Sequence, residues 1–370
     1  MSTLPKVTIV TTTIRVPVFL EEISENALRY HKDNINFIII GDKNTPQDAI
    51  NYCINLDKKY PYSFDYYSIE DQERELKQYQ DLLEIVPYNS GSRKLLGCFI
   101  AYKQGADVVI QIDDDNFIGE RDFVGEHCVV STNKPMDLYH SETGWYNIYE
   151  NIIEESNIPI FPRGYPWGQR IYSKQSDVDC ILEEKKVVLI NGLVYEDPDI
   201  DAISRLFWPI RIIGMKDTIN DNFGLYPGTW TSFNNQNTSM TRELAQVYFT
   251  PIAAGRNSDI WTSYVMCRLV EEKGDVIAFG APYVKQFRNP HDLWDDLELE
   301  LLNNKTTDIF VSILKTTILE GDSYIDLLKD LIKKSIQLID SIDGGELNSD
   351  QVDMMKKYFE QYNVWAHAIE

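Results

Sequence analysis

The sequence predicts an α/β fold in which a mostly parallel mixed sheet is flanked by helices and followed by a helical C-terminal appendage. Two observations carry this prediction. Short β-branched runs alternate with helical patterns over the first part of the chain, as in a parallel sheet covered on both faces. Glycine and proline become rare after about residue 296, where helical periodicity takes over.

The first part of the chain contains strand-like runs and helical patterns in alternation. The predicted strands cover residues 7–10, 36–40, 64–68 and 108–112, and the predicted helices cover residues 18–30, 46–59 and 93–103. Right-handed crossovers would place three strand ends, at residues 11–15, 41–43 and 113–115, on one rim of the sheet. In open α/β sheets, ligands bind at such a rim.

Residues 120–295 are less regular and are rich in aromatic residues, glycine, proline and asparagine. Long irregular stretches of this kind often build a binding site. We therefore expect a domain over residues 1–295 and a helical region over residues 296–370. The apolar stripe of this last region either packs on the first domain, which we favour, or forms the surface of a homo-oligomer.

The overall composition argues against several classes of protein. The 370 residues carry a formal net charge of −23, which disfavours nucleic acid and anionic membranes as partners. No apolar stretch reaches the roughly 18 residues of a transmembrane segment, and the N-terminus lacks a signal-peptide pattern. The five cysteines are scattered without a Cys-x-x-Cys pair, so we expect a reducing, cytoplasmic location. Dinucleotide, P-loop, serine-hydrolase and zinc-protease motifs are also missing from the sequence.

Three consecutive carboxylates, Asp113, Asp114 and Asp115, follow directly on the apolar run of residues 108–112. A buried strand cannot hold three unpaired charges, so these side chains must lie at its carboxyl end. Clustered carboxylates need a cation, and hard oxygen ligands favour Mg²⁺ or Mn²⁺. Such a metal could hold the phosphates of a nucleotide. An acidic turn that faces solvent is the alternative interpretation.

Further candidates lie on the same predicted rim. Asp42 follows the second strand, where its carboxylate could accept hydrogen bonds from a base or ribose, or could simply form a turn. Arg93 and Lys94 open the helix before the aspartates and could face phosphates, pair with the aspartates or remain solvated. Three residues at the end of the first strand are also assigned to nucleotide binding: Thr11, Thr12 and Arg15.

Four more candidate residues lie in the irregular part of the chain. Residues 163–170 combine Arg163 and Arg170 with aromatic residues and glycines, a set that suits phosphate and sugar contacts or an ordinary loop. Asp259 begins a predicted helix and is either a first-turn acid or a general base that lines the cleft. His291 is either a further metal ligand or an ordinary hydrogen-bonding residue.

Taken together, these residues resemble nucleotide-sugar glycosyltransferases of the GT-A type, which have a Rossmann-like sheet and an Asp-x-Asp metal motif at a strand end. The sequence is similar to the reversibly glycosylated polypeptides, also called UDP-arabinopyranose mutases, and to STELLO-type glycosyltransferases. Residues 92–97, Ser-Arg-Lys-Leu-Leu-Gly, and the aspartates after them resemble the STELLO-type stretch. Residues 163–170 resemble the Arg-Gly-Tyr-Pro-Phe-Ser-Leu-Arg of the polypeptide family, and residues 256–261 resemble its Arg-Tyr-Asp-Asp-Met-Trp.

The resemblance implies a GT-A fold and assigns roles to individual residues. Asp113 and Asp115 would bind Mn²⁺ or Mg²⁺ and the diphosphate, and Asp113 and Asp114 are assigned to nucleotide-sugar binding. Arg163 matches the arginine that becomes glycosylated in the mutase family, and Arg170 matches a second arginine that this activity needs. The chain departs from the family at residues 257 and 258, where Asn-Ser replaces an aromatic residue and an aspartate.

We therefore expect a metal-dependent glycosyltransferase that moves a sugar from a UDP-sugar to a hydroxyl group of a carbohydrate or another acceptor. The metal, helped by Arg93 or Lys94, would neutralise the leaving diphosphate. Asp259 would deprotonate the acceptor in an inverting displacement. A UDP-sugar pyranose/furanose mutase or a self-glycosylating protein is the alternative on the same site. A scaffold that assembles through its helical tail is the non-enzymatic alternative.

Overall fold

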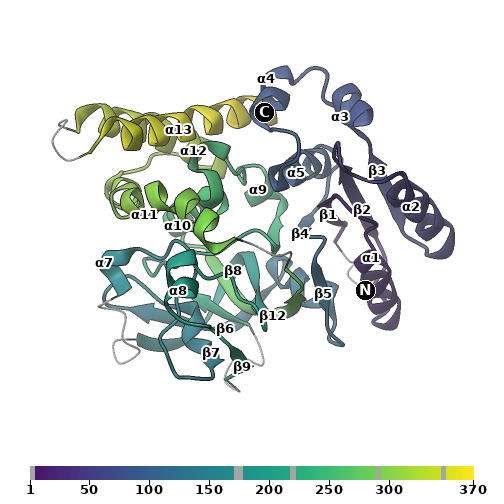
Figure 1. Ribbon diagram of the computed structural model, residues 1–370, viewed down its shortest axis with the longest axis horizontal. Helices are drawn as coiled ribbons and strands as arrows, with labels where there is room; N and C mark the ends of the chain where they lie inside the picture. The colour runs from purple at the N-terminus through teal and green to yellow at the C-terminus, as the bar shows by residue number, and fades with distance from the viewer. Residues whose placement is uncertain (1–4, 171–177, 217–221, 289–291, 343–346) are drawn as a thin grey trace.

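The computed structural model describes residues 5–170, 178–216, 222–288, 292–342 and 347–370. Over these residues, a ten-stranded sheet is flanked by helices (Figure 1) and accompanied by a two-stranded sheet. The strand order in the large sheet is β3-β2-β1-β4-β11-β8-β6-β10-β12-β5. The predicted α/β class, a mixed sheet flanked by helices with further helices at the C-terminal end, is confirmed.

The N-terminal part follows the predicted alternation of strands and helices. The elements in chain order are β1 (Val7–Thr13), α1 (Phe19–Arg29), β2 (Ile35–Gly41), α2 (Gln47–Lys59), β3 (Ser63–Tyr67), α3 (Ile69–Glu75), α4 (Gln80–Ile85), α5 (Lys94–Lys103) and β4 (Val108–Ile112). One difference affects the site. Because β1 continues to Thr13, Thr11 and Thr12 belong to the strand and not to the loop after it.

The carboxyl ends of β1 and β4 form a topological switch point. β1 pairs in parallel with β2 on one side and with β4 on the other. The chain moves outward from β1 to β2 and β3 and then returns to β4, so the strand order reverses between β1 and β4. At such a reversal, a crevice opens outside the strand ends, where ligands bind in α/β sheets.

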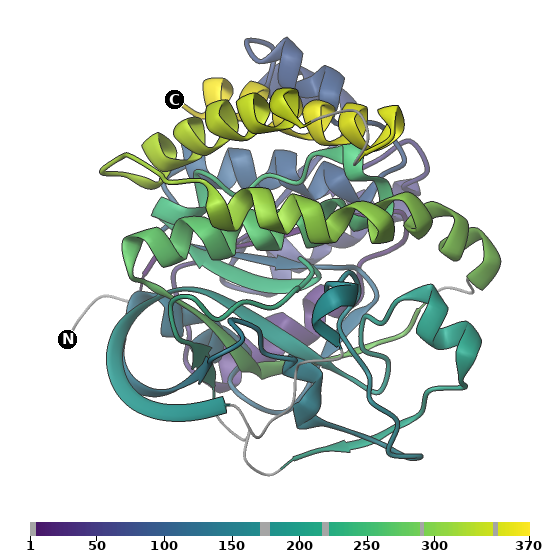
Figure 2. The ribbon, with the colours of Figure 1, turned by 90° about the vertical axis from the view of Figure 1, so that its left-hand side faces the viewer.

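The second half of the large sheet departs from the mostly parallel arrangement that the sequence predicts. β11 is antiparallel to β4 and β8, and β6 is antiparallel to β8. β8 curves around this end of the molecule (Figure 2) and pairs first with β6 and then with β12. Its first half is largely exposed and its second half is buried, so no uniform hydrophobic period marks it in the sequence.

The remaining elements before the C-terminal helices surround this half of the sheet. They are β5 (Asn116–Ile118), α6 (Phe123–His127), β6 (Asn133–Ser141), β7 (Ile152–Glu154), α7 (Trp167–Arg170), β8 (Val178–Tyr195), α8 (Ala202–Phe207), β9 (Ile212–Met215), β10 (Phe223–Leu225), β11 (Asn237–Thr241), α9 (Arg242–Ala245), α10 (Ser258–Lys273) and β12 (Val276–Gln286). β7 and β9 form the small sheet. Of these, the helix that begins near Asp259 was expected from the sequence.

Alternate residues of the central strands supply two hydrophobic layers, as strand geometry requires. Val10 belongs to the cluster beneath α5, whereas Ile9 belongs to the cluster beneath α1 and α2. Gly97 of α5 lies directly against the sheet, because a Cβ at this position would come within 2.5 Å of Val10 Cγ1. Glycine therefore lets α5 approach the strands closely, and this approach sets Lys94 beside the strand ends.

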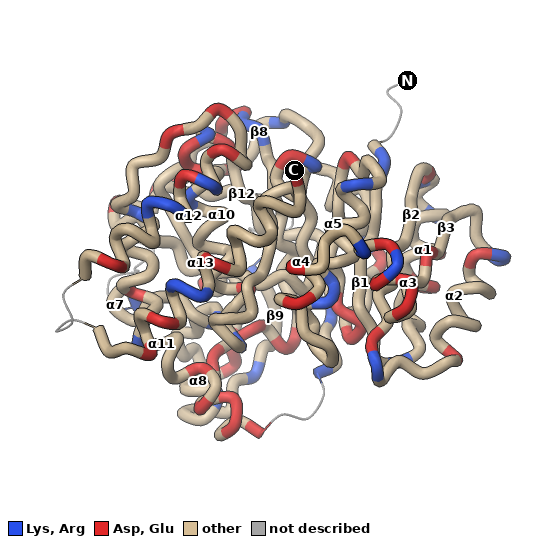
Figure 3. Tube along the Cα trace, turned by 90° about the horizontal axis from the view of Figure 1, so that it is seen from above, with Lys and Arg blue, Asp and Glu red and all other residues tan. Residues whose placement is uncertain are grey.

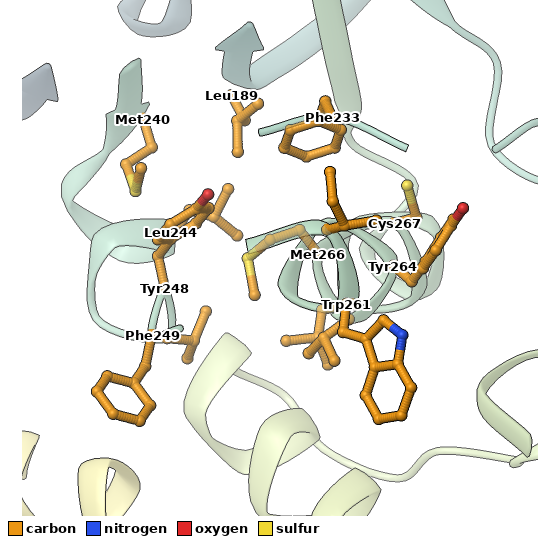
Figure 4. Close-up of a cluster of buried hydrophobic side chains, with 14 of the residues drawn as sticks. Leu189, Phe233, Met240, Leu244, Tyr248, Phe249, Trp261, Tyr264, Met266 and Cys267 are labelled. Atoms are coloured by element: carbon orange, nitrogen blue, oxygen red, sulfur yellow. The ribbon is translucent and has the colours of Figure 1, made fainter. Parts of the chain in front are cut away.

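Three long helices form a layer on one side of the molecule (Figure 2): α11 (Leu293–Thr316), α12 (Tyr324–Ser341) and α13 (Ser349–Ile369). Asn348 caps α13, as the sequence predicts. The layer shares a core with the rest of the chain, since Trp261 of α10 stacks on Phe310 and Trp365 stacks on Phe249. Trp261 and Phe249 are labelled among the buried side chains of this core in Figure 4. The boundary expected after residue 295 falls inside the first turn of α11.

Acidic residues outnumber basic residues by 58 to 35, and both kinds are spread along the chain (Figure 3). Among the described residues, no helix is long and apolar enough to span a membrane. The local pairing of charges, rather than the net charge, distinguishes the clusters described below.

Candidate functional site

A pocket with an open volume of about 630 Å³ lies at the switch point between β1 and β4. Its lining comes from the ends of β1, β2 and β4 and from the loop before α5: Thr12, Thr13, Ile14, Asp42, Asn89, Ser90, Gly91, Asp113, Asp114 and Asp115. The structure thus brings Thr12 and Asp42 together with the aspartate triad, which denotes Asp113, Asp114 and Asp115. Thr11 is buried and is not part of the lining.

Asp114 ties the end of β4 to the end of β1. Its Oδ2 atom accepts hydrogen bonds from Thr13 Oγ1 at 2.8 Å and from the backbone N–H of Ile14 at 3.3 Å. Arg15 Nε lies 3.3 Å from the same oxygen and forms an ion pair with it. These contacts join the two strands at the switch point and place Arg15 beside the triad. The middle carboxylate of the triad is therefore largely occupied by the protein itself.

Asp113 is paired with Lys94 at the side of the pocket. Lys94 Nζ forms a salt bridge with Asp113 Oδ1 and donates a hydrogen bond to the carbonyl oxygen of Asn235 at 2.8 Å. Lys94 is buried at the N-terminus of α5, where the helix dipole disfavours a cation, so the aspartate compensates for its charge. The side chain of Asp113 remains 38% exposed and can still accept a ligand from the pocket.

Asp115 has a buried carboxylate oxygen with no hydrogen-bond partner among the described residues. Its Oδ2 atom accepts a hydrogen bond from Gln286 Nε2 at 3.2 Å, whereas Oδ1 is unpartnered. Burial and the neighbouring charge of Asp113 raise the pKa of the Asp115 carboxyl. Because an unpaired buried carboxylate is costly, this oxygen is suited to a cation that binds in the pocket.

The residues present fit a divalent cation that the protein coordinates only in part. Within the described parts of the chain, no group of three His, Cys, Asp or Glu side chains could hold a metal ion by itself. Mg²⁺ in nucleotide sites usually keeps several waters and binds through one or two carboxylates together with substrate phosphates. Asp113 and Asp115 provide such a pair of carboxylates. His291, which was expected as a further metal ligand, lies outside the described residues.

Asp42, at the end of β2, fixes the loop that lines the pocket. Its Oδ2 atom accepts a hydrogen bond from the backbone N–H of Ser90 at 3.2 Å, and its Oδ1 atom accepts one from Lys43 at 2.7 Å. Each carboxylate oxygen can accept a second hydrogen bond. Asp42 therefore both shapes the pocket and can meet an N–H group of a base or a hydroxyl group of a ribose.

Arg93 does not reach the pocket, contrary to the expectation that it faces phosphates. It is buried, and its Nε donates a hydrogen bond to Gln72 Oε1 at 3.1 Å. Its guanidinium group also lies against the ring of Tyr88, 4.5 Å from the centroid. Gln72 in turn donates to the carbonyl oxygen of Gly41 at 2.8 Å. Arg93 therefore supports the end of β2 through Gln72. It points away from the pocket, although Lys94 lies at the side of the pocket, because consecutive residues of a helical turn point in different directions.

Arg163 lies at the centre of a second, buried group of charges. Its Nε and Nη2 atoms donate to the carboxylate of Asp199 at 2.9 to 3.0 Å, and Nη2 also donates to Asp259 at 3.1 and 3.2 Å. Its Nη1 atom donates to Asn257 Oδ1 at 3.3 Å and to the carbonyl oxygen of Arg256. Arg163, Asp199, Asp259 and Asn257 are called the Arg163 cluster below. All three nitrogens of the guanidinium group are engaged in this cluster.

The carboxylates of the Arg163 cluster differ in their electrostatics. Burial disfavours ionisation of Asp199, but the charges of Arg163 and Arg288 outweigh burial and hold its pKa well below the ordinary value. At Asp259, by contrast, burial prevails over the charge of Arg163 and raises the pKa. Asp259 lies in the first turn of α10 and is not its N-cap, which is Asn257.

Arg170 is held apart from the pocket lining. Its Nη2 atom donates to Asp201 Oδ2 at 2.7 Å, and its guanidinium group stacks on the ring of Trp167, 3.8 Å from the centroid. Asp201 is buried at the N-cap of α8. The two arginines of residues 163–170 therefore each bind a different buried aspartate, and neither lines the pocket.

The segment just before β11 connects the aspartate triad with the Arg163 cluster. Asn234 Nδ2 donates to Asp199 Oδ2 at 3.0 Å. The next two residues contact the triad side, since Asn235 accepts from Lys94 and the carbonyl oxygen of Gln236 accepts from the backbone N–H of Asp113 at 3.0 Å. Sequence reasoning missed this segment, because its contacts with the triad side run through backbone carbonyls that any residue type supplies.

No protein-family model and no curated protein matches the chain. Among solved structures, it is similar to a glucosyl-3-phosphoglycerate synthase from Mycobacterium tuberculosis in complex with Mn²⁺, UDP-glucose and phosphoglyceric acid, with 11% identity over 86% of this chain and 82% of that chain and a TM-score of 0.40. It is also similar to the mannosyltransferase PcManGT from Pyrobaculum calidifontis in complex with GDP-Man and Mn²⁺, with 9% identity over 98% and 87% of the two chains and a TM-score of 0.40. S. aureus TarS shares 11% identity over 90% of this chain and 50% of its own, with a TM-score of 0.35. Similarity this remote does not define a function, which rests on the site itself.

Proposed function

We propose that this protein is a metal-dependent glycosyltransferase that moves a sugar from a nucleoside-diphosphate sugar to an acceptor hydroxyl group. One observation carries the proposal. At the switch point between β1 and β4, Asp113 and Asp115 line a pocket, and Asp115 keeps a buried oxygen without a partner among the residues that the structure describes. The sequence resemblance to GT-A enzymes favours a UDP-sugar as the donor.

Each residue of the proposed donor site has its own role. Asp113 and Asp115 would hold Mn²⁺ or Mg²⁺, which would neutralise the negative charge that develops on the leaving diphosphate. Lys94 balances the charge of Asp113, and Asp42 offers hydrogen-bond acceptors at the other end of the rim. Asp114 keeps the two strand ends together and thereby orients the carboxylates on either side of it.

Asp259 is the proposed general base. A base must hold a proton readily near neutral pH, and burial raises the pKa of this carboxyl. In the proposed displacement, the acceptor oxygen forms a bond to the anomeric carbon while the bond from that carbon to the diphosphate breaks. The acceptor proton passes to Asp259, and both electrons of the broken bond leave with the nucleoside diphosphate. Arg163 holds the Asp259 carboxylate in place.

The burial, hydrogen bonding and protonation of Arg163 argue against a mechanism in which this arginine itself accepts the sugar. The side chain is buried, and each guanidinium nitrogen already donates hydrogen bonds. Two neighbouring carboxylates, Asp199 and Asp259, outweigh burial and raise the pKa of Arg163 above its ordinary value. A protonated guanidinium group has no lone pair for attack on a sugar carbon. A transfer to an external hydroxyl group therefore fits this site better than self-glycosylation.

A ligand screen followed by a product assay tests the proposal. Nucleotide sugars with and without Mn²⁺ are added to the wild-type protein, and the melting temperature is recorded, because a ligand that binds the native state raises it. We expect a metal-dependent rise for a UDP-sugar and its loss in Asp115→Asn. Asp353→Asn, which removes the same charge from the exposed face of α13, is the matched control and should keep the rise.

The products then separate the alternatives. Release of UDP with transfer of the sugar to an added acceptor supports the transferase. A ring-isomerised nucleotide sugar as the product would instead identify a mutase. If no nucleotide sugar changes the melting temperature of the wild type with any divalent metal, the donor site and the proposed function are both wrong.

A further inference from the structure

The first half of β8, residues 178–186, has one strand edge without a partner among the described residues. β6 pairs with these residues along one edge. β11 and β12 pair with β8 only from residue 187 onward. Leu182, in the middle of the segment, is 70% exposed, and the strand lies at the periphery of the molecule (Figure 2). Such an edge presents free N–H and C=O groups that can pair with another strand.

The charges along this edge favour one particular partner, a second copy of the same segment. A twofold axis perpendicular to the sheet would pair two copies in antiparallel fashion, with side chains of the same face opposite each other. When the axis passes through Leu182, Asp179 of one copy lies opposite Lys185 of the other, and this attractive pair occurs twice. No like charges then face each other along the segment.

The neighbouring registers lack this complementarity. An axis through Ile181 would place Asp179 opposite Glu183, and an axis through Glu183 would place that residue opposite itself. Like charges directly opposite each other are destabilising in an antiparallel pair. The acidic residues at 179, 183 and 184 and the lysines at 185 and 186 therefore both select one register and disfavour unrelated strands.

We infer that the protein forms a homodimer in which residues 178–186 of two copies pair in antiparallel fashion about Leu182. This interface joins two copies of the β6–β8 ladder into one continuous sheet. It differs from the oligomer through the C-terminal helices that the sequence allowed. The apolar side chains of those helices, such as Leu328 and Trp365, are already buried against the protein's own core.

A charge-swap experiment on the full-length chain tests this interface. We expect sedimentation velocity to show a species of twice 42.9 kDa for the wild type that dissociates on dilution. Asp179→Lys and Lys185→Asp should each place like charges opposite each other at two points and weaken dimerisation by at least about tenfold. The double variant, with both substitutions, restores opposite charges and should restore the dimer.

A control outside the segment makes the test specific. Ile318→Asp, at a 79% exposed position between α11 and α12, should leave the dimer intact. Thermal melts of each variant verify that the fold is retained. A wild-type monomer at the highest soluble concentration overturns the inference. The inference is also overturned if the dimer survives both Asp179→Lys and Lys185→Asp, or if the double variant does not restore it. Loss of the dimer in Ile318→Asp overturns it as well.

Discussion

The aspartate triad and the Arg163 cluster are both groups of carboxylates and cations, yet they differ in how far the protein satisfies their hydrogen bonds. In the Arg163 cluster, every guanidinium nitrogen is bonded and Asp199 accepts from both Arg163 and Asn234. In the triad, Asp114 is bonded to the end of β1, whereas Asp115 keeps a buried oxygen with no partner in the described part of the chain, and Asp113 is partly exposed. The difference teaches that the number of charges does not locate a ligand site. We propose that the incompletely bonded carboxylates at the strand ends bind the ligand.

This comparison implies that the two groups respond differently to substitution. Changes in the triad should alter ligand binding with little effect on folding, and changes at Arg163 should alter folding first. Asp259 stands between the two cases, because it is bonded within the Arg163 cluster but has a raised pKa.

Replacement of the proposed base should have the largest effect on the reaction. We expect Asp259→Asn to lower the rate of sugar transfer by about 10²- to 10⁴-fold, because asparagine cannot take up the acceptor proton. The amide keeps the size of the side chain, so metal-dependent donor binding should stay as in the wild type. Steady-state kinetics and a melting-temperature titration with the donor measure the two effects. An unchanged transfer rate would rule out Asp259 as the base.

Removal of the arginine should have the largest effect on stability. In Arg163→Ala, Asp199 and Asp259 stay buried without their shared cation, so the free energy of unfolding should fall by about 3–5 kcal/mol. Arg163→Lys keeps one positive charge but loses the bidentate contact, so its loss should be smaller. Urea denaturation measures both variants. Equal stability of wild type and Arg163→Ala would show that the cluster does not hold the fold together.

Acid should affect the two groups in a fixed order. The pKa of Asp115 is raised above its ordinary value of 3.8, so its charged form, and with it metal binding, should be lost while the pH is still above that value. The pKa of Asp199 is lowered, so the stability it contributes is fully present above 3.8 and is lost only as the pH falls below it. Mn²⁺ titrations and unfolding curves across the acidic range should therefore show loss of metal affinity before loss of stability. The reverse order would contradict the assignment.

The smallest effect should come from loss of the hydrogen bond that Thr13 donates to Asp114. Thr13→Val removes the hydroxyl group that donates to Asp114, and we expect a loss of about 1 kcal/mol in the free energy of unfolding. The affinity for Mn²⁺ with a nucleotide should change little, because Asp113 and Asp115 keep their own contacts. Calorimetric titration checks this point. A loss of metal binding comparable to that of Asp115→Asn would mean that the three carboxylates act as one unit.

The sequence allowed the strands of the N-terminal half and the position of the aspartates to be predicted, because both depend on local hydrophobic pattern and on the rule that strand ends share a rim. Without the family resemblance, the residues alone could not separate Asp114 from Asp115, since their partners, Thr13 and Gln286, lie far away in the chain. The sequence pattern also placed Arg93 in the pocket. The direction of that side chain depends on Gln72, a residue without a recognisable motif.

The antiparallel half of the sheet escaped prediction for a related reason. β11 is a strand of polar residues, Asn237–Thr241, that is buried between β4 and β8. No hydrophobic period marks such a strand, and its burial becomes evident only when both neighbours are in place. The Arg163 cluster escaped prediction as well, because its members, Arg163, Asp199, Asn257 and Asp259, come from three distant parts of the chain.

The most direct test of the account is an electron paramagnetic resonance titration of Mn²⁺ against the protein, with and without UDP. The account predicts that UDP strengthens Mn²⁺ binding, because the pocket supplies only the carboxylates of Asp113 and Asp115 and the phosphates complete the coordination. Asp115→Asn should abolish this binding, and Asp353→Asn should leave it unchanged. Mn²⁺ binding that is indifferent to both UDP and Asp115 would contradict the central claim.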